Sequence, residues 1–196
     1  MHALFCRRSL RLAFGTIVTW AVVGIGCQGN DPPAETYGAP AAYVNVCSRC
    51  HGADANGTPL APELHHPPRD FATWAVRNGR PGVGYGFPGA MLAIPTTEVS
   101  DVELTALLDW LWAFPKSAEG QALYVDFCGN CHGADGRGGT SGQTTAGKLK
   151  SDIVAKVRNG HATTAFADRK NFMPAYDEAT ITSDDLAKID AFLGAR

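Results

Sequence analysis

Two five-residue segments with the same pattern stand 81 positions apart in this 196-residue chain: Cys47-Ser48-Arg49-Cys50-His51 and Cys128-Gly129-Asn130-Cys131-His132. Two thiols separated by two residues can form thioethers to the two vinyl groups along one edge of a haem. The histidine after the second thiol then lies beneath the iron and serves as an axial ligand. The spacing therefore predicts two covalently bound haem c groups, one at each segment.

Cysteine pairs with this spacing also occur in zinc sites and in thiol redox centres, and four thiolates together can form an all-cysteine zinc cluster. Neither alternative requires a histidine after the second cysteine, whereas both copies here have one. We therefore favour haem attachment over zinc binding and over a redox dithiol.

The distal side of each haem separates an electron carrier from an enzyme, because an open iron binds substrate and a second protein ligand blocks it. Apart from Met1 the chain has two methionines, Met91 and Met173, one after each haem motif. Both lie in apolar, proline-bearing segments able to press a thioether onto iron. We predict that they are the distal ligands; core packing is the alternative for each.

Three other histidines of the mature chain are the rival ligands. His65 and His66 lie in a proline-rich segment and His161 follows a turn, so we expect all three at the surface. Arg77 and Arg158 have matching places after the two motifs. They either pair with haem propionates, since a guanidinium matches a carboxylate, or are solvated at the surface.

The similarity between the two parts of the chain extends beyond the motifs. The segment 76–79 recurs at 157–160 with the offset of 81, and Met91 corresponds to Met173 with an offset of 82. One inserted residue in the second part explains the change. A tandem duplication with one haem per copy is the simplest explanation, and it predicts domain 1 at residues 40–115 and domain 2 at residues 116–196.

Each copy is expected to contain helices joined by long loops. The helix before the first haem motif is expected to begin near Pro40, and its counterpart near Ser117, a favoured N-cap residue only three residues after Phe114. So short a connection restricts relative motion. Ser100 and Glu103 form a capping box before the closing helix of the first copy. Apolar residues at helical spacing form the buried faces of the two closing helices: Leu104, Leu107, Leu108, Leu111, and Leu186, Ile189, Leu193.

Residues 1–26 have the features of an export signal, because three arginines precede an uncharged, mostly apolar run at 12–26. Its 15 residues are short for a membrane-spanning helix, which needs about 20. The segment 22–27 resembles the lipobox of bacterial lipoproteins, which implies lipidation of Cys27 and a membrane tether at residues 27–39. A soluble periplasmic protein and an uncleaved N-terminal anchor are the alternatives.

The charge of the exported chain argues against nucleic-acid binding. Without residues 1–26 it has 14 basic and 19 acidic residues, a net charge of −5. Residues 28–115 carry four basic and nine acidic side chains, whereas residues 116–196 carry ten of each. This difference predicts different docking partners for the two domains.

On the two motifs and the methionines that follow them, residues 38–196 resemble the class I cytochromes c, and in particular their two-domain, two-haem members. The resemblance implies an all-α fold with a few helices around each haem, in which the first and last helices cross. It also assigns roles: thioethers to Cys47, Cys50, Cys128 and Cys131, proximal ligation to His51 and His132, and distal ligation to Met91 and Met173.

The segment Ala61-Pro62-Glu63-Leu64 is similar to the family's loop in which a proline carbonyl orients the proximal histidine. No proline occurs between His132 and Pro174, so the resemblance names no such partner for His132. The glycine usual on the first helix is present as Gly120 but is replaced by Ala39 in the first copy.

From these features we expect a carrier of single electrons at the periplasmic side of a bacterial membrane, with redox proteins as its donor and acceptor. The alternatives are a two-haem peroxidase-like oxidoreductase and an electron-entry subunit of a membrane oxidase or reductase complex.

Overall fold

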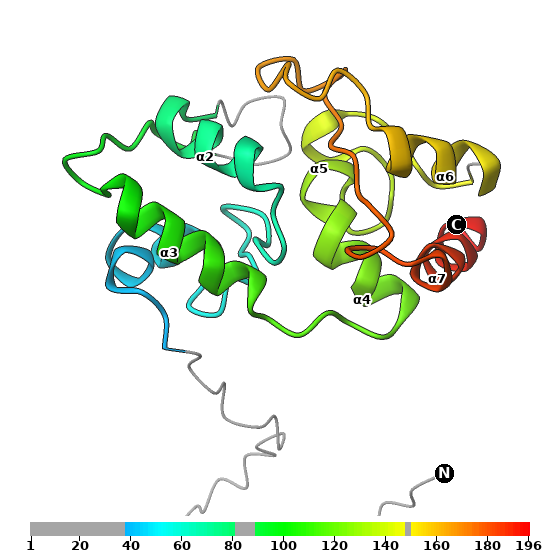
Figure 1. The fold of residues 1–196 in the computed structure, drawn as a ribbon, viewed down its shortest axis with the longest axis horizontal. Helices are drawn as coiled ribbons and strands as arrows, with labels where there is room; N and C mark the ends of the chain where they lie inside the picture. The colour runs from blue at the N-terminus through cyan, green and yellow to red at the C-terminus, as the bar shows by residue number, and fades with distance from the viewer. Residues whose placement is uncertain (1–37, 81–88, 148–149) are drawn as a thin grey trace, which may run out of the picture. The chain divides into compact units, whose positions relative to one another are not determined.

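The computed structural model describes residues 38–80, 89–147 and 150–196, all within one compact unit at residues 34–196. In these ranges the regular structure is helical, with isolated β-bridges in place of strands (Figure 1). This agrees with the predicted all-α class. The predicted export signal and Cys27 lie outside the described residues. None of the helices in the described ranges is long and apolar enough to cross a bilayer.

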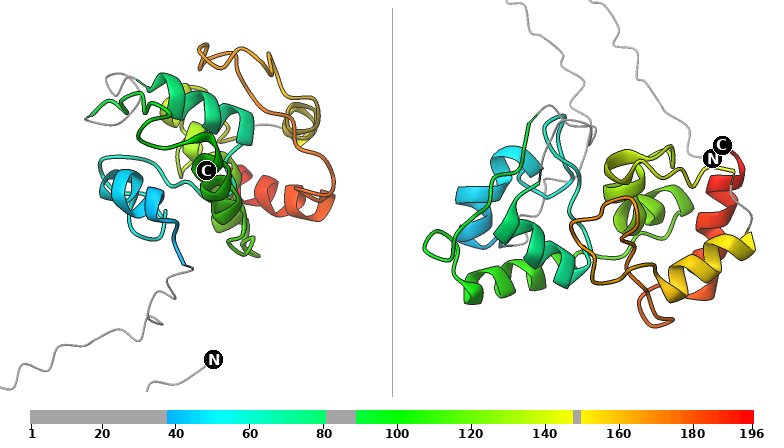
Figure 2. Two further views of the ribbon diagram at one scale, coloured as in Figure 1. Left: turned by 60° about the vertical axis from the view of Figure 1, so that its left-hand side comes forward. Right: turned by 90° about the horizontal axis from the view of Figure 1, so that it is seen from above.

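The two repeats contain corresponding helices (Figures 1 and 2). Those of the first repeat are η1 (Tyr43–Cys47), α1 (Ser48–His51), α2 (Arg69–Asn78) and α3 (Asp101–Trp112). Those of the second repeat are α4 (Gly120–Tyr124), η2 (Val125–Gly129), α5 (Asn130–His132), η3 (Gly139–Ser141), α6 (Lys150–Asn159) and α7 (Ser183–Gly194).

The helix that carries the first haem motif begins at residue 41, as the position of Pro40 predicts, and continues to His51. Its middle part, η1, has the wide turns of a π-helix, and η2 has the same place in the second repeat. Such turns are rare and occur frequently at functional sites. Here they contain the first cysteine of each motif, Cys47 and Cys128.

Each repeat has its own apolar core beneath its closing helix. The predicted buried faces are confirmed, and Ser100 forms the predicted capping box with Glu103 at the start of α3. Thr182 and Asp185 form an equivalent box at the start of α7. The core of the first repeat consists of Tyr43, Ala55, Val99, Leu104, Leu107, Leu108 and Leu111. That of the second consists of Leu123, Tyr124, Phe127, Ile153, Val157, Tyr176, Ile181, Leu186, Ile189 and Leu193.

The first and last helices of the second repeat, α4 and α7, pack closely at Gly120. A Cβ atom at this position would lie less than 3.0 Å from the backbone carbonyl oxygen of Lys188, which real Cβ atoms do not do. In the first repeat Ala39 precedes the helix and packs against the core, while the ring of Tyr43 lies 4.5 Å from that of Trp110 in α3. The glycine is therefore needed where α4 crosses α7.

The predicted start of the second repeat's first helix at Ser117 is wrong. The N-cap of α4 is Glu119, whose side chain makes no capping hydrogen bond. Ser117 lies outside the helix because its backbone N–H donates to Oδ2 of Asp126 at 2.9 Å. The connection from α3 to α4 is therefore residues 113–119, longer than the predicted three residues.

Candidate haem sites

The four motif cysteines, Cys47, Cys50, Cys128 and Cys131, are free thiols. Burial, before any other cause, raises the pKa of Cys47 to about 11 and that of Cys128 to about 12, and it also raises the pKa of Cys131. Thiolate is the form that binds zinc and exchanges disulfides. The raised pKa values therefore disfavour a redox dithiol, and within the described residues the four cysteines form no cluster of three or more possible metal ligands, which disfavours an all-thiolate zinc site.

His51, at the end of α1, is 8% exposed, and its Nδ1 lies 2.8 Å from the carbonyl oxygen of Pro62. A carbonyl only accepts hydrogen bonds, so Nδ1 carries the proton and Nε2 is the nitrogen available to a metal. Burial lowers the pKa of His51, against a smaller opposing effect of the bond to Pro62. The imidazole is thus neutral and oriented by the proline loop that the family resemblance implies.

His132 has a partner that the resemblance did not name. Its Nδ1 lies 2.8 Å from the carbonyl oxygen of Gln143, and the hydroxyl of Ser141 lies 3.5 Å away. Burial again lowers the pKa of the histidine. The carbonyl of Gln143 thus has the role that the carbonyl of Pro62 has for His51. The imidazole of His132 is therefore also neutral, with Nε2 available to a metal.

The two methionines lie in segments with the same backbone pairing. The N–H of Met91 donates to the carbonyl of Arg80 at 2.8 Å, and the carbonyl of Met91 accepts from the N–H of Arg80 at 2.7 Å. Met173 exchanges the same pair of bonds with His161, at 2.8 and 2.9 Å. Phe87 and Pro88, part of the apolar segment before Met91, lie outside the described residues. Both methionines are partly buried. In each repeat the residue that pairs with the methionine lies just after the middle helix, so the backbone at the methionine is fixed there.

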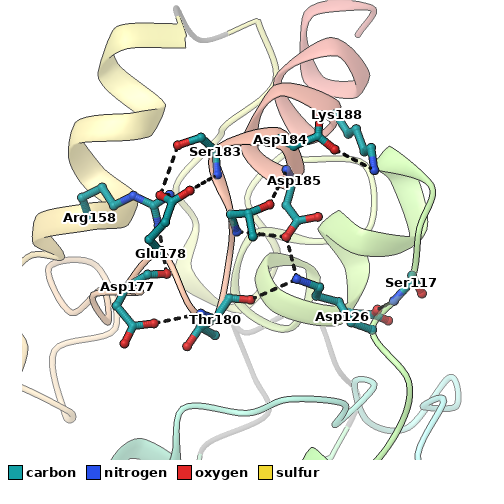
Figure 3. A network of polar contacts seen from close by, with 12 residues as sticks. Ser117, Asp126, Arg158, Asp177, Glu178, Thr180, Ser183, Asp184, Asp185 and Lys188 are labelled. Atoms are coloured by element: carbon teal, nitrogen blue, oxygen red, sulfur yellow. Dashed lines mark hydrogen bonds and ion pairs between the residues drawn. The ribbon is translucent and has the colours of Figure 1, made fainter.

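One of the two expectations for Arg77 and Arg158 was that they are solvated at the surface. The structure instead gives both side chains several protein partners. Arg77 donates to the carbonyl oxygen of Ile94 at 3.0 Å and pairs with Asp101. Arg158 donates to the carbonyl oxygen of Tyr176 at 3.0 Å. It also donates to the carbonyl oxygen of Asp177 at 3.0 Å and pairs with Glu178 (Figure 3). Both arginines therefore attach the methionine segment to the preceding helix.

The donors of each repeat fit a haem c group. Each offers two free thiols, one neutral imidazole with Nε2 available, and a thioether in a backbone-paired segment. In the first repeat Nε of Arg77 is buried and has no hydrogen-bond partner. A buried donor of this kind needs an acceptor, and a propionate carboxylate would satisfy it. Propionate binding therefore stays a prediction for Arg77.

The expectation that His65 and His66 lie at the surface is wrong, whereas His161 is exposed as predicted. His66 is 4% exposed and stacks on Phe127 of the second repeat, with ring centroids 4.7 Å apart. His65 stacks on Phe114 at 4.3 Å. His66 is buried and the side chain of His65 is only 13% exposed, because the second repeat packs against the loop that contains them.

His65 also joins two acidic side chains across the repeats. Its Nδ1 lies 3.1 Å from Glu63 and 3.8 Å from Asp126, and its Nε2 lies 3.0 Å from the carbonyl oxygen of Asp54. Burial acts to lower the pKa of His65, but its interactions with Asp126 and Glu63 outweigh burial and raise it to about 10. The ring is therefore an imidazolium that links the repeats.

A second contact between the repeats involves aromatic rings close to the methionine segments. Phe71 of α2 stacks on Phe172, which precedes Met173, with centroids 4.9 Å apart and planes 22° apart. The guanidinium of Arg80, the backbone partner of Met91, lies 4.9 Å from the Phe71 ring. The two methionine segments thus approach one aromatic cluster.

The family model described as cytochrome C oxidase, cbb3-type, subunit III matches the chain twice, at residues 36–111 and 115–193. Over 156 residues the chain is 30% identical to a protein of Rubrivivax gelatinosus described as Cbb3-type cytochrome c oxidase subunit CcoP. The match covers 74% of this chain and 49% of the relative, so the chain spans about half the relative's length. No solved structure matches the chain significantly.

Proposed function

The chain belongs to the family of cytochrome C oxidase, cbb3-type, subunit III, and on that premise we propose that it carries single electrons between protein partners through two haem c groups. The duplicated arrangement of donors is the main support. In each repeat a Cys-x-x-Cys-His motif has its histidine oriented by a carbonyl at 2.8 Å, and a methionine segment is fixed by paired backbone bonds.

Haem iron, when bound, supplies a couple that gains and loses one electron. The work of the chain's own residues is to hold that group and set its surroundings. The cysteines attach it permanently, while the carbonyls of Pro62 and Gln143 keep the proton of each histidine on Nδ1. The backbone bonds of Met91 to Arg80 and of Met173 to His161 hold the two segments that carry the thioethers.

A peroxidase-like enzyme is the less favoured alternative, because it requires one distal side that opens easily. Here each methionine is held by two backbone bonds, and each segment is also attached by an arginine, Arg77 or Arg158. These contacts favour two closed distal sides and therefore a carrier.

The more specific proposal is that the protein delivers electrons to a membrane oxidase complex. Its support is the match to an oxidase subunit family and to the subunit named CcoP. We propose a position at the periplasmic side of the membrane with lipidated Cys27 as the anchor, which the sequence at 22–27 favours. Co-purification of a membrane oxidase with the full-length chain tests the partner.

Carbon monoxide binding to the reduced, haem-loaded protein tests the choice between carrier and enzyme. We expect the optical spectrum to stay unchanged under carbon monoxide, because both distal sides are occupied by sulfur. The Met91→Ala and Met173→Ala proteins are the positive controls, since each opens one site. Binding to either haem of the unaltered protein at neutral pH would contradict the carrier function.

A further inference from the structure

The side chain of Asn130, inside the second haem motif, makes a hydrogen bond to the first repeat. Its Nδ2 donates to the carbonyl oxygen of Glu63 at 2.9 Å, across 67 positions of sequence. Because a carbonyl oxygen only accepts, the amide nitrogen must face it. The residue between two haem-binding cysteines of one repeat therefore contacts the backbone of the other.

The backbone that Asn130 contacts is the one that orients the first proximal histidine. Glu63 directly follows Pro62, whose carbonyl oxygen lies 2.8 Å from Nδ1 of His51. The carbonyls on the two sides of residue 63 thus accept from the two haem motifs, one from His51 and the next from Asn130. The carbonyl of Pro62 belongs to the Pro62–Glu63 peptide and that of Glu63 to the next one, Glu63–Leu64, so the two planar units share the Cα atom of Glu63. The N–H of the second unit donates to the carbonyl oxygen of Ala55 at 2.9 Å, so a shift of Glu63 would disturb the bonds of both units.

Both ends of this bond are held by further contacts. The carbonyl of Asn130 accepts from the hydroxyl of Thr140 at 3.0 Å, and the carbonyl of Thr140 accepts from Arg169 at 2.8 Å. At the other end, Oε1 of Glu63 lies 3.1 Å from Nδ1 of His65. Because these contacts hold Asn130 in place, its side chain can fix the position of the loop that contains Glu63.

The arrangement is not reciprocal. The residue of the first motif that corresponds to Asn130 is Arg49, which is exposed. His132 takes its carbonyl partner, Gln143, from its own repeat. Any influence through this contact therefore runs from the second motif to the first histidine.

We propose that Asn130 is a positioning residue for the first haem site: it holds the Glu63–Leu64 peptide and, through the Cα atom of Glu63, the adjoining Pro62 carbonyl, so that the bond from His51 to Pro62 is kept. This inference rests on the proposed function. A strong hydrogen bond on Nδ1 makes the imidazole a more basic ligand, which favours the oxidised iron. Removing the Asn130 donor should weaken that bond and raise the reduction potential of the first haem, which is not the haem attached next to residue 130.

The test is a redox titration of the full-length, haem-loaded protein and of Asn130→Leu, which is similar in size, uncharged and unable to donate. We expect the equilibrium constant for reduction of the first haem to rise about fivefold, the effect of one net hydrogen bond. For a one-electron couple this is about 40 mV. The second couple should stay in place. The Met91→Ala protein identifies which couple belongs to the first repeat.

Asn45→Leu is the matched control, because it makes the same substitution at an exposed position of the first haem helix. It should move neither couple. Asn130→Ser is a second variant whose side chain is too short to reach Glu63, and it should reproduce the shift even where Asn130→Leu loses haem. A shift of the second couple alone, equal shifts of both couples, or no shift would overturn the inference. Absence of two couples in the unaltered protein would instead contradict the proposed function.

Discussion

Gly120 at the start of α4 lies directly against the backbone of Lys188 in α7, so a Cβ atom at residue 120 would stand 3.0 Å from the carbonyl carbon of Lys188 and still closer to its oxygen. This contact brings the first and last helices of the second repeat together. Leu123 of α4 joins Leu186 and Ile189 of α7 in the core of the same repeat.

Gly120→Ala should destabilise the protein by about 2 kcal/mol, because overpacking against a backbone atom forces the two helices apart. Denaturant unfolding of the haem-loaded protein measures the loss. Gly194→Ala is the control: this glycine lies in α7 with no neighbour within 4 Å of an added Cβ, so the free energy of unfolding should change by less than about 0.5 kcal/mol. Equal effects of the two substitutions would contradict the close crossing.

His65→Gln should cost about 3 kcal/mol at neutral pH, because it removes the cation between two largely buried carboxylates. The pKa of His65 is raised to about 10 in the folded protein, above its ordinary 6.5. Its contribution to stability is therefore complete below about pH 6.5 and is lost as the pH rises toward 10. Unfolding of both proteins across this range should show the difference shrinking with pH.

Lys188→Gln is the control for His65, because Lys188 pairs with Asp184 at the surface. Its effect on the free energy of unfolding should be much smaller than that of His65→Gln, because exposed ion pairs contribute little. If the His65→Gln difference grew or stayed constant toward pH 10, the proposed imidazolium would be wrong.

Met91→Ala and Met173→Ala should each remove one distal sulfur and leave two haems attached. Each variant should bind about one carbon monoxide per chain when reduced, and the two together should bind two, since the repeats are separate sites. Optical titration measures the stoichiometry. A single variant that binds none would show that its methionine is core packing, which is the alternative given by the sequence.

Local patterns in the sequence predicted much of this structure. The capping box at Ser100 and the buried leucines of α3 depend on neighbouring residues, and the structure has them in place. The pairing of Met91 with Arg80 and of Met173 with His161 follows the change of offset to 82. Such features are set by helix geometry and by duplication, so they can be read without tertiary contacts.

The errors concern contacts between residues far apart. We predicted His65 and His66 at the surface because they lie in a proline-rich loop. In the structure His65 contacts Asp126 and His66 stacks on Phe127, both from the other repeat. The partner of His132 is the backbone carbonyl of Gln143. Every residue type has such a carbonyl, so the sequence does not reveal which residue supplies it. Asn130 was missed for a related reason: its acceptor, the carbonyl of Glu63, lies 67 positions away.

The central claim is that one haem is covalently attached in each repeat, and the intact mass of the purified protein tests it most directly. We expect the denatured chain to retain the mass of two haems, and the Cys47→Ala/Cys50→Ala protein to retain one, still attached at Cys128 and Cys131. An unaltered chain that carries no added porphyrin mass, or a double variant that still carries two, would contradict the account.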